Sequence, residues 1–416
     1  MLLNYLEQYK NDVSLCVKCG GCQPSCPTFE ATGDESMLAR GRMALVEAVI
    51  EGRLELSKGF SRRINSCLDC KACVSACPSA VPVDEIIYAA KADIALNMGC
   101  KPFTGTLPGI IALRPSLQKG LMRIMGGLKK IFYDPLPVFF PLPKALKYKG
   151  KKRLVPHISG RPFNSRAGGI HRVKEKRGRV IFYVGCATNM MHQHIGEAVL
   201  EVLNHNNIEV IVMKDEHCCG IPFLSKGDRA TAEKLARKNI EQLTSAEADA
   251  IVTCCATCGS TLQNYTKWID DKEAKRLAKK TMDIHQYLAN HTEFKNGIGE
   301  VKEKVTWHDP CHLSRGQGIK DEPRDILNAI PGLEFIEMSN PCHCCGFGGE
   351  VSVQDYAMSI DIADKKIRAI TGSGAETVAT GCPACKIHMT DAMHHYGEER
   401  PVMHTVEYLA RAYRGN

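Results

Sequence analysis

The sequence predicts a mixed fold, with an α-helical module in the first hundred residues followed by two related α/β domains. Three observations support this prediction. Two four-cysteine runs recur within the first eighty residues, a different cysteine pattern recurs after residue 180, and strand-like and helix-like stretches alternate between the later cysteines. We expect an α-helical domain at 1–100, a connector at 101–178, and two α/β domains at 179–300 and 301–416, because one hydrophobic core rarely extends over such a length.

Cysteine content is the most informative feature of the composition. The chain has 416 residues and 21 cysteines, whereas its 44% hydrophobic and 24% charged residues are ordinary for a globular protein. The first residues lack the apolar core and cleavage site of a secretory signal, so we expect a cytoplasmic protein. In that reducing compartment, clustered cysteines more often bind metal or act in catalysis than form disulfides.

The N-terminal module carries the motif CVKCGGCQPSCP at 16–27 and again, as CLDCKACVSACP, at 67–78. The spacing CxxCxxCxxxCP is that of bacterial ferredoxins, in which three thiolates of a run hold one [4Fe-4S] cluster and the fourth belongs to the neighbouring cluster. Zinc is the alternative, but zinc requires neither the third cysteine of each run nor the proline. We therefore predict two [4Fe-4S] cubane clusters, one held by Cys16, Cys19, Cys22 and Cys77 and the other by Cys67, Cys70, Cys73 and Cys26.

The segment between the two runs predicts an inserted helix. Apolar residues of MLARGRMALVEAVIEGRLEL, residues 37–56, recur at helical spacing, which makes the module an α-helical ferredoxin domain. Arg40 and Arg42 have two interpretations here. They are either cations that offset the negative charge of a nearby cluster or the solvated start of the helix.

A longer repeat follows the connector. VIFYVGCATN, DEHCCGIPF and AIVTCCATCG in one copy correspond to VTWHDPCHLS, PCHCCGFGG and TVATGCPACK in the other, with equivalent cysteines offset by 125 to 127 residues. RVIFYV and IEVIVM predict strands, and MHQHIGEAVLEVLNHN and RATAEKLARKNIEQL predict helices. This alternation predicts a Rossmann-like domain with a parallel sheet in each copy, and its cysteines gather at the carboxyl ends of the strands, where ligands bind.

Five cysteines per copy exceed the four that one cubane cluster needs. The fifth is either a spare thiol or a ligand of an opened, noncubane cluster in which two adjacent cysteines bridge irons. Zinc with a spare thiol is another interpretation, because CxxC pairs are common zinc ligands. Disulfides are disfavoured inside a reducing cell.

Together, the two motif sets resemble the iron–sulfur subunit of glycolate and lactate oxidase complexes, a CCG-domain family related to the catalytic subunit of heterodisulfide reductase. The resemblance covers about residues 5–410. CPTFEATGDESMLARGRMALVEAVIEG is closest to the glycolate oxidase branch, which usually has proline at Ala39, whereas the completeness of both cysteine sets is closer to heterodisulfide reductase. The resemblance implies one or two further [4Fe-4S] clusters, noncubane in heterodisulfide reductase, held by Cys186, Cys218, Cys219, Cys255 and Cys258 and by Cys311, Cys344, Cys345, Cys382 and Cys385.

Three cysteines remain outside these sets. Cys254 precedes Cys255, and we assign Cys255 as the ligand because the two copies then align. Cys342 is interpreted as a free thiol or a residue beside the ligands, and Cys100 as a small buried residue. Four histidines near the cysteine loops are either proton donors or packing residues, namely His217, His308, His312 and His343.

The connector carries all the excess positive charge. Residues 101–180 contain 19 Lys and Arg against 2 Asp and Glu, and the formal net charge of the chain is +8. This asymmetry argues against a nucleic-acid-binding protein. We interpret the basic segment as a solvated linker, a docking site for an acidic partner, or a peripheral contact with the inner face of a membrane. No apolar run is long enough to cross one.

The chain has no GxGxxG fingerprint after a strand, no catalytic triad and no carboxylate pair, so we expect flavin chemistry to lie in a partner subunit. The resemblance implies an iron–sulfur electron-transfer subunit of an oxidoreductase. It would link a partner FAD-dependent glycolate or lactate dehydrogenase to an acceptor such as a quinone, a cytochrome or an electron-transfer flavoprotein. A heterodisulfide reductase-like subunit that cleaves a disulfide at noncubane clusters is the second hypothesis. A zinc-bound structural or nucleic-acid-binding protein is the third.

Overall fold

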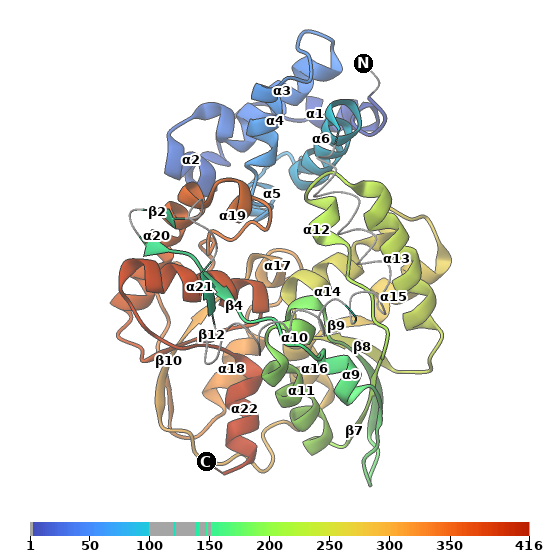
Figure 1. Cartoon of the computed structure of the whole chain (residues 1–416), viewed down its shortest axis with the longest axis vertical. Coiled ribbons are helices and arrows are strands. Elements are labelled where there is room, and N and C mark those ends of the chain that lie inside the picture. Colours follow the sequence, from blue (N-terminus) through green and yellow to red (C-terminus); the bar gives the residue numbers. More distant parts are fainter. Residues whose placement is uncertain (1–2, 100–119, 121–138, 142–146, 149–150, 416) are drawn as a thin grey trace. The chain divides into compact units, whose positions relative to one another are not determined.

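The computed structural model describes residues 3–99, 120, 139–141, 147–148 and 151–415 (Figure 1). Cys100 and most of the connector lie outside the described residues. The chain forms two compact units, and we call them the small unit and the large unit. The small unit consists of Met1–Gly109, Gly220–Ala232 and His343–Lys365, and the large unit of Ile110–Cys219, Glu233–Cys342 and Lys366–Asn416.

The small unit is helical, as the sequence predicts. Its core is formed by apolar side chains such as Met43, Val46, Ile64 and Ile86. The N-terminal segment is fixed by the fully buried Asp93, which accepts hydrogen bonds from three backbone N–H groups in that segment. The main helices are α1 (Lys10–Ser14), α2 (Pro27–Thr32), α3 (Ala39–Ile50), α4 (Lys58–Asn65), α5 (Ala72–Ser75) and α6 (Val83–Met98), with short 3₁₀ turns η1 (Glu7–Tyr9), η2 (Gln23–Ser25) and η3 (Glu35–Met37).

The inserted helix is shorter than the periodicity indicates. Helix α3 ends at Ile50, and the backbone of Gly52 then adopts a left-handed conformation with φ of 73°. Such a glycine commonly ends a helix because it has no Cβ to clash. A second helix, α4, begins after Ser57, whose hydroxyl accepts the backbone N–H of Phe60. The insertion is therefore a pair of helices.

The large unit contains two parallel sheets, one from each repeat. The first has the order β5-β7-β6-β8-β9, in which only the edge strand β5 is antiparallel, and the second has the order β11-β10-β12-β13. The four parallel strands thus follow the order second, first, third, fourth in both repeats. The strands are β5 (Gly169–His171), β6 (Gly178–Tyr183), β7 (Ile208–Val212), β8 (Ala250–Thr253), β9 (Thr281–Asp283), β10 (Glu303–His308), β11 (Leu333–Phe335), β12 (Thr377–Thr380) and β13 (Val402–His404).

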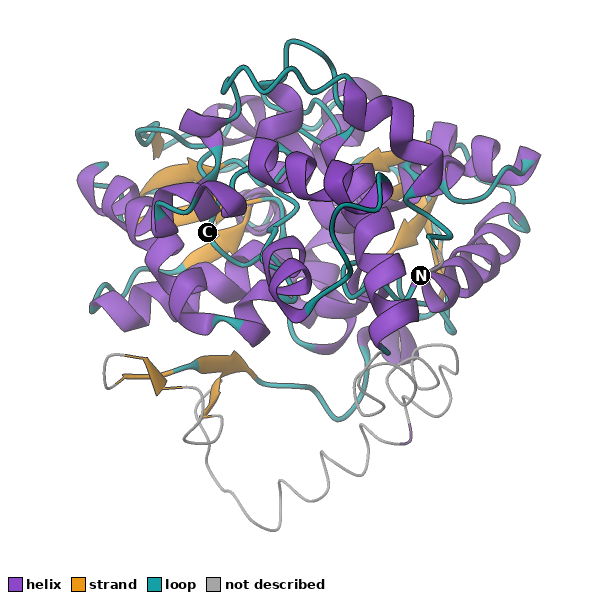
Figure 2. Ribbon diagram, turned by 90° about the horizontal axis from the view of Figure 1, so that it is seen from above, coloured by secondary structure: helices purple, strands orange, loops and turns teal. Residues whose placement is uncertain are grey.

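Helices lie on both sides of these strands (Figure 2). The last four residues of β6 and β10 and all of β8 and β12 are buried, as expected for parallel strands covered on both faces. The helices of the first repeat are α9 (Phe163–Ala167), α10 (Cys186–Met190), α11 (Gln193–His205), α12 (Ile221–Leu224), α13 (Arg229–Thr244), α14 (Ala256–Gln263), α15 (Lys272–Lys280) and α16 (Ile284–His291), with the 3₁₀ turn η5 (Tyr265–Lys267). Those of the second are α17 (Cys311–Ser314), α18 (Glu322–Asn328), α19 (Val351–Gln354), α20 (Tyr356–Gly372), α21 (Pro383–Tyr396) and α22 (Thr405–Tyr413). Of all these helices, α12 and α19 belong to the small unit, and α13 and α20 begin in it.

The two repeats share one hydrophobic core within the large unit. It combines Val199 and Val202 of α11 with Val406 and Leu409 of α22. In the described part of the connector, β1 (Phe139–Pro141) pairs with β4 (Leu154–Pro156), and β2 (Lys147–Tyr148) with β3 (Lys151–Lys152). Among the described residues, the structure contains no helix with the length and apolar character needed to span a membrane.

Candidate metal centres

One pocket of the small unit, which we call the first pocket, is lined by Cys16, Cys19, Cys22 and Cys77. The first three come from the loop that joins α1 to α2, and the fourth follows α5. The side chain of Cys19 is exposed and the other three are half-buried. The structure thus brings together the four cysteines that the ferredoxin spacing assigns to one cluster, although they come from both runs.

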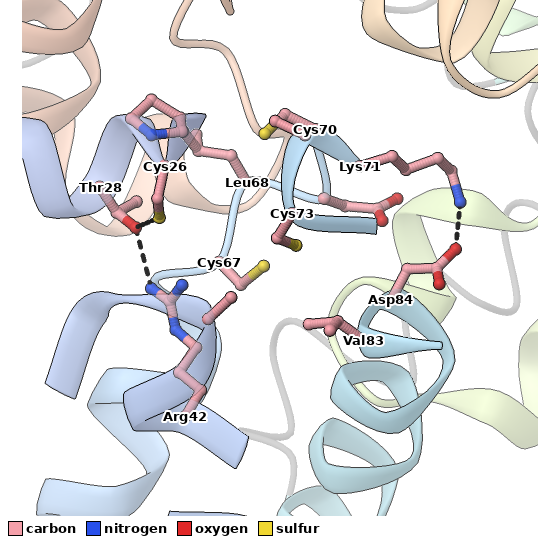
Figure 3. A pocket seen from close by; sticks show the side chains of 14 residues that line it. Cys26, Thr28, Arg42, Cys67, Leu68, Cys70, Lys71, Cys73, Val83 and Asp84 are labelled. Carbon is pink, nitrogen blue, oxygen red and sulfur yellow. Dashed lines mark hydrogen bonds and ion pairs between the residues drawn. The ribbon is translucent and has the colours of Figure 1, made fainter. Parts of the chain in front are cut away.

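A second pocket is lined by Cys26, Cys67, Cys70 and Cys73 (Figure 3). These are the four cysteines that the spacing assigns to the other cluster. Cys26 Sγ lies 3.3 Å from the hydroxyl of Thr28, which anchors this thiol beside the start of α2. Because Cys73 also lines the first pocket, the two pockets share a wall.

The backbone of the two runs follows the same unusual path. In the first run Lys18 and Gly20 have φ of 57° and 85°, and the equivalent Asp69 and Lys71 have φ of 52° and 58°. Residues other than glycine adopt this left-handed conformation at an energetic cost. Left-handed residues of this kind occur in backbone concavities that bind anions. A negatively charged cluster suits this backbone.

Burial makes two thiols of the second pocket, those of Cys67 and Cys73, poor acids in the absence of metal. It raises the pKa of Cys67, and burial together with the neighbouring Cys67 and Cys70 raises the pKa of Cys73 well above its ordinary value. Crowded thiols lose their protons together only when cations neutralise the thiolates. In each pocket, four lining cysteines and predominantly apolar walls fit a [4Fe-4S] cluster.

In the large unit, five cysteines of the first repeat lie together. We call them the first CCG set, and they are Cys186, Cys218, Cys219, Cys255 and Cys258. The thiol of Cys186 is hydrogen-bonded to that of Cys218, and Cys258 is hydrogen-bonded to Cys219 and Cys255. They follow β6, β7 and β8, so the parallel strands deliver them to one edge of the sheet. Gly185, with φ of 74°, allows this close packing, since a Cβ there would lie 3.0 Å from Cys258 Sγ.

Three polar side chains hold the loops of this set, and no local pattern in the sequence marks them. Glu216 accepts the backbone N–H groups of Val184 and Gly185, each at 2.7 Å, and burial raises the pKa of Glu216 to about 8. The carbonyl of Cys218 accepts a hydrogen bond from Asn239, and the carbonyl of Cys219 accepts one from Tyr265. The hydrogen bonds to these two carbonyl groups hold the backbone of Cys218 and Cys219 in place.

The second CCG set is divided between the two units. Cys311, Cys382 and Cys385 belong to the large unit, and Cys344 and Cys345 to the small unit. The Cys382 thiol accepts hydrogen bonds from Cys255 and Cys385, which hold its pKa well below the ordinary value. His308 and Cys385 place their donor atoms within 4.8 Å of each other. In the small unit, the backbone N–H of Gly346 donates to Cys344 Sγ at 3.4 Å.

The remaining cysteines occupy different environments. Cys254 is fully buried in the hydrophobic core of the large unit, where its Sγ lies 3.6 Å from the hydroxyl of Thr188 and burial raises its pKa to about 12. Cys255 instead contacts other cysteines, so the geometry supports the choice of Cys255 over Cys254. Cys342 is exposed. Among the four histidines, His308 is buried beside Cys385, and the carbonyl groups of His217 and His312 accept hydrogen bonds that brace their loops.

Comparison with known proteins agrees with this geometry. Residues 12–81 match the family model of a 4Fe-4S dicluster domain, and residues 180–263 and 305–390 each match the cysteine-rich domain CCG. One subunit of the fumarate reductase (CoM/CoB) of Methanothermobacter marburgensis is 30% identical, over 98% of this chain and 74% of its own length. A probable glycolate oxidase iron–sulfur subunit of Bacillus subtilis is 27% identical, over 90% and 87%. Lactate utilization protein A of Exiguobacterium sp. is 29% identical, over 55% and 96%.

The resemblance drawn from the sequence is therefore confirmed, and the zinc interpretation is set aside. The mixed α/β fold, with a dicluster domain before two CCG repeats, is also confirmed. The chain holds more than one [4Fe-4S] cluster and is an iron–sulfur subunit of the oxidoreductase type. It belongs to the CCG-domain family of iron–sulfur proteins.

Proposed function

We propose that this subunit passes electrons between a partner FAD-dependent dehydrogenase of a 2-hydroxy acid, such as glycolate or lactate, and an acceptor such as a quinone, a cytochrome or an electron-transfer flavoprotein. The proposal is supported by the relative named as a glycolate oxidase iron–sulfur subunit, which aligns over most of both chains. The relative named for lactate utilization aligns over 55% of this chain. Both names point to oxidation of a 2-hydroxy acid.

The observation that carries this proposal is the wall shared by the first and second pockets. Cys73 lines both, so the centres in them would be close enough for an electron to pass directly.

In this proposal the ligands are the predicted ones, namely Cys16, Cys19, Cys22 and Cys77 in the first pocket, Cys26, Cys67, Cys70 and Cys73 in the second, Cys186, Cys218, Cys219, Cys255 and Cys258 in the first CCG set, and Cys311, Cys344, Cys345, Cys382 and Cys385 in the second. The proposal includes a Rossmann-like domain in each repeat, which the shared order of the parallel strands supports.

The protein's own residues would prepare these sites for one-electron chemistry. The bound clusters supply the redox couple. The left-handed residues of the runs would favour an anion beside the backbone, and the apolar walls would exclude water. Glu216, Asn239 and Tyr265 keep the loops of the first CCG set in place.

Anaerobic purification of the native complex tests this function. We expect a brown complex that contains iron, sulfide and flavin, and we expect glycolate or lactate to reduce its clusters, as observed by electron paramagnetic resonance. Malonate, which has no hydroxyl to oxidise, is the control and should leave the clusters oxidised. Isolation of a stable, active complex without any flavoprotein would contradict the proposal.

A second candidate function is cleavage of a disulfide by the two CCG sites. It is favoured by the contact between Cys255 of one set and Cys382 of the other, which brings the two sites beside each other. A relative is named for fumarate reduction with CoM and CoB. In this reaction the S–S bond would break, a reduced electron donor would supply two electrons through clusters held by the ferredoxin-type cysteines, and two protons would complete the two thiol products.

The two functions are distinguished by adding a thiol to the oxidised protein. Disulfide chemistry requires a thiol-dependent paramagnetic signal that is lost in Cys382→Ser. The control variant Cys342→Ser removes an exposed cysteine outside both sets and should keep the signal. Absence of any thiol-dependent signal in the wild type would leave electron transfer as the function.

A further inference from the structure

Arg42 is a buried cation in the wall of the second pocket. It lies in α3, its exposed fraction is 2%, and it lines the pocket together with Cys26 and Cys67. Figure 3 shows its guanidinium reaching the side of the pocket that carries Thr28. An arginine side chain retains its proton at any ordinary pH, so a full positive charge is held here.

The partners of this guanidinium are neutral. Its Nε donates to the carbonyl of Arg63 at 2.8 Å, and its Nη2 donates to the hydroxyl of Thr28 at 3.2 Å and lies 4.0 Å from the sulfur of Met37. Within the described part of the chain, Arg42 makes no ion pair with a carboxylate. A buried charge without a counter-charge is strongly unfavourable. The side chain is therefore placed for an anion in the pocket.

Arg40, which precedes Arg42 by two residues, does have a carboxylate as its partner. It lines the first pocket, but its Nε and Nη2 donate to the two carboxylate oxygens of Glu35 at 2.5 and 3.1 Å. The Arg40 side chain is 27% exposed and that of Glu35 is 51% exposed. Its charge is thus neutralised by a partner and screened by solvent. The two arginines leave the two pockets electrostatically different.

The other charges of the second pocket do not replace Arg42. Lys71 forms an ion pair with Asp84, so their charges offset each other. Asp69 accepts a hydrogen bond from the hydroxyl of Tyr88. The buried Lys91 lies nearby, with Nζ 3.5 Å from the carbonyl of Cys67, but it is not among the residues that line the pocket. Among the described basic residues that line this pocket, only Arg42 makes no ion pair with a carboxylate.

We propose that Arg42 raises the reduction potential of the [4Fe-4S] cluster held by Cys26, Cys67, Cys70 and Cys73. The inference rests on the ligand assignment of the proposed function. Reduction adds one negative charge to a cluster that is already an anion, and burial disfavours that addition. A cation at the pocket wall stabilises the reduced state more than the oxidised state, most effectively at low dielectric.

This effect keeps the buried centre reducible by its neighbour. With clusters held by the cysteines of both pockets, one electron would pass between them, so that one cluster would be oxidised and the other reduced. No bond breaks and no proton moves. Arg42 is thus a tuning residue for electron transfer, in addition to the structural link that its bond to the Arg63 carbonyl provides between α3 and α4.

Redox titration of the anaerobically purified full chain, followed by electron paramagnetic resonance, tests the proposal. In Arg42→Gln we expect one cluster signal to shift to lower potential, with iron and sulfide content unchanged. Arg42→Lys retains the charge and should titrate close to the wild type. Arg40→Gln is the matched control and should shift no signal as far. Unchanged potentials in an iron-replete Arg42→Gln, or an equal shift in Arg42→Lys, would overturn the proposal.

A second variant keeps the test decisive if Arg42→Gln loses iron. Glu35→Gln changes an exposed residue and removes the counter-charge of Arg40. The same electrostatics then predict a shift to higher potential in a different signal from the one that Arg42 controls, and this shift is smaller because solvent screens Arg40. No shift in an iron-replete Glu35→Gln would contradict the charge argument. Iron-free wild-type protein would instead defeat the ligand assignment and the proposed function with it.

Discussion

Cys255 and Cys382 are in thiol-to-thiol hydrogen-bonding contact, although they belong to different repeats. They occupy equivalent positions, each two residues beyond the end of the third parallel strand of its repeat. Cys258 and Cys385 extend this contact on either side, and the hydroxyl of Thr257 lies 3.6 Å from Cys382 Sγ. The two repeats thus present their CxxC pairs to each other, so a ligand bound by one set lies beside the other.

This arrangement predicts different effects of two neighbouring cysteines on iron content. Cys255→Ser should lose roughly four iron atoms per chain, the content of one [4Fe-4S] cluster, because its thiol faces the other cysteines. Cys254→Ser is the control and should keep its iron, since Cys254 lies in the hydrophobic core. Iron and sulfide analysis of both anaerobic variants measures the difference. Equal iron loss in the two variants would assign Cys254 to the site as well.

Much of the site could be predicted from cysteine spacing alone. A run of CxxCxxC reaches three corners of a cluster by itself, so the fourth ligand must come from elsewhere, and Cys26 and Cys77 lie where that exchange between runs requires. The strands β6 and β7 likewise begin within one residue of the apolar runs that predict them. The spacing of the cysteines and the periodicity of the apolar residues are enough to predict these features.

Other features depend on packing between distant segments. The ambiguity of Arg42 could not be resolved from the sequence, because its burial is created by α2 and α4 rather than by its neighbours in α3. No local sequence pattern predicts the role of Glu216, because only the fold brings its carboxylate to the backbone N–H groups of Val184 and Gly185. The sequence repeat also could not predict that Cys344 and Cys345 belong to the small unit, because a repeat shows which residues are equivalent and not which segments pack together.

Proton release should accompany cluster assembly. Burial raises the pKa of Cys67 and Cys73 in the folded chain without metal, so these thiols carry protons at neutral pH. Iron binds thiolates, and each ligation must expel a proton. Anaerobic reconstitution in weak buffer should therefore acidify the solution and become more favourable as the pH rises from about 7 to 9. Reconstitution independent of pH would show that the thiols are already ionised.

Acid should destabilise the large unit through His192. Burial, with lesser contributions from Lys386 and His194, lowers the pKa of His192 to about 3. The unfolded chain binds this proton near pH 6.5, so it holds more protons than the folded chain between about pH 3 and 6.5, and stability falls as the pH falls through that range. Between pH 6.5 and 5 the loss is roughly 1.5 kcal/mol.

His192→Gln removes this titration and should flatten the pH dependence by that amount. Urea unfolding under anaerobic conditions at several pH values measures it, with the urea midpoint and slope determined at each pH. Parallel pH profiles for wild type and variant would mean that His192 is protonated in the folded state as readily as in the unfolded chain.

Two helical glycines of the small unit should respond with opposite sign to alanine. In an open helix position, alanine is more stable than glycine by up to about 1 kcal/mol. Gly59 in α4 is such a position, because an added Cβ would find its nearest neighbour, the Nη1 of Arg63, at 3.5 Å. Gly59→Ala should therefore stabilise the small unit.

Gly41 in α3 is a close-contact position, since an added Cβ would lie 2.0 Å from the backbone carbonyl oxygen of Glu35. Relief of that clash must move η3 away from α3, and overpacking of this kind costs about 1 to 3 kcal/mol. The same movement separates Glu35 from Arg40, so Gly41→Ala should disturb the first pocket as well as lower stability. Anaerobic thermal unfolding with iron analysis compares the two variants. A stabilised Gly41→Ala with full iron content would show that η3 and α3 can separate without cost.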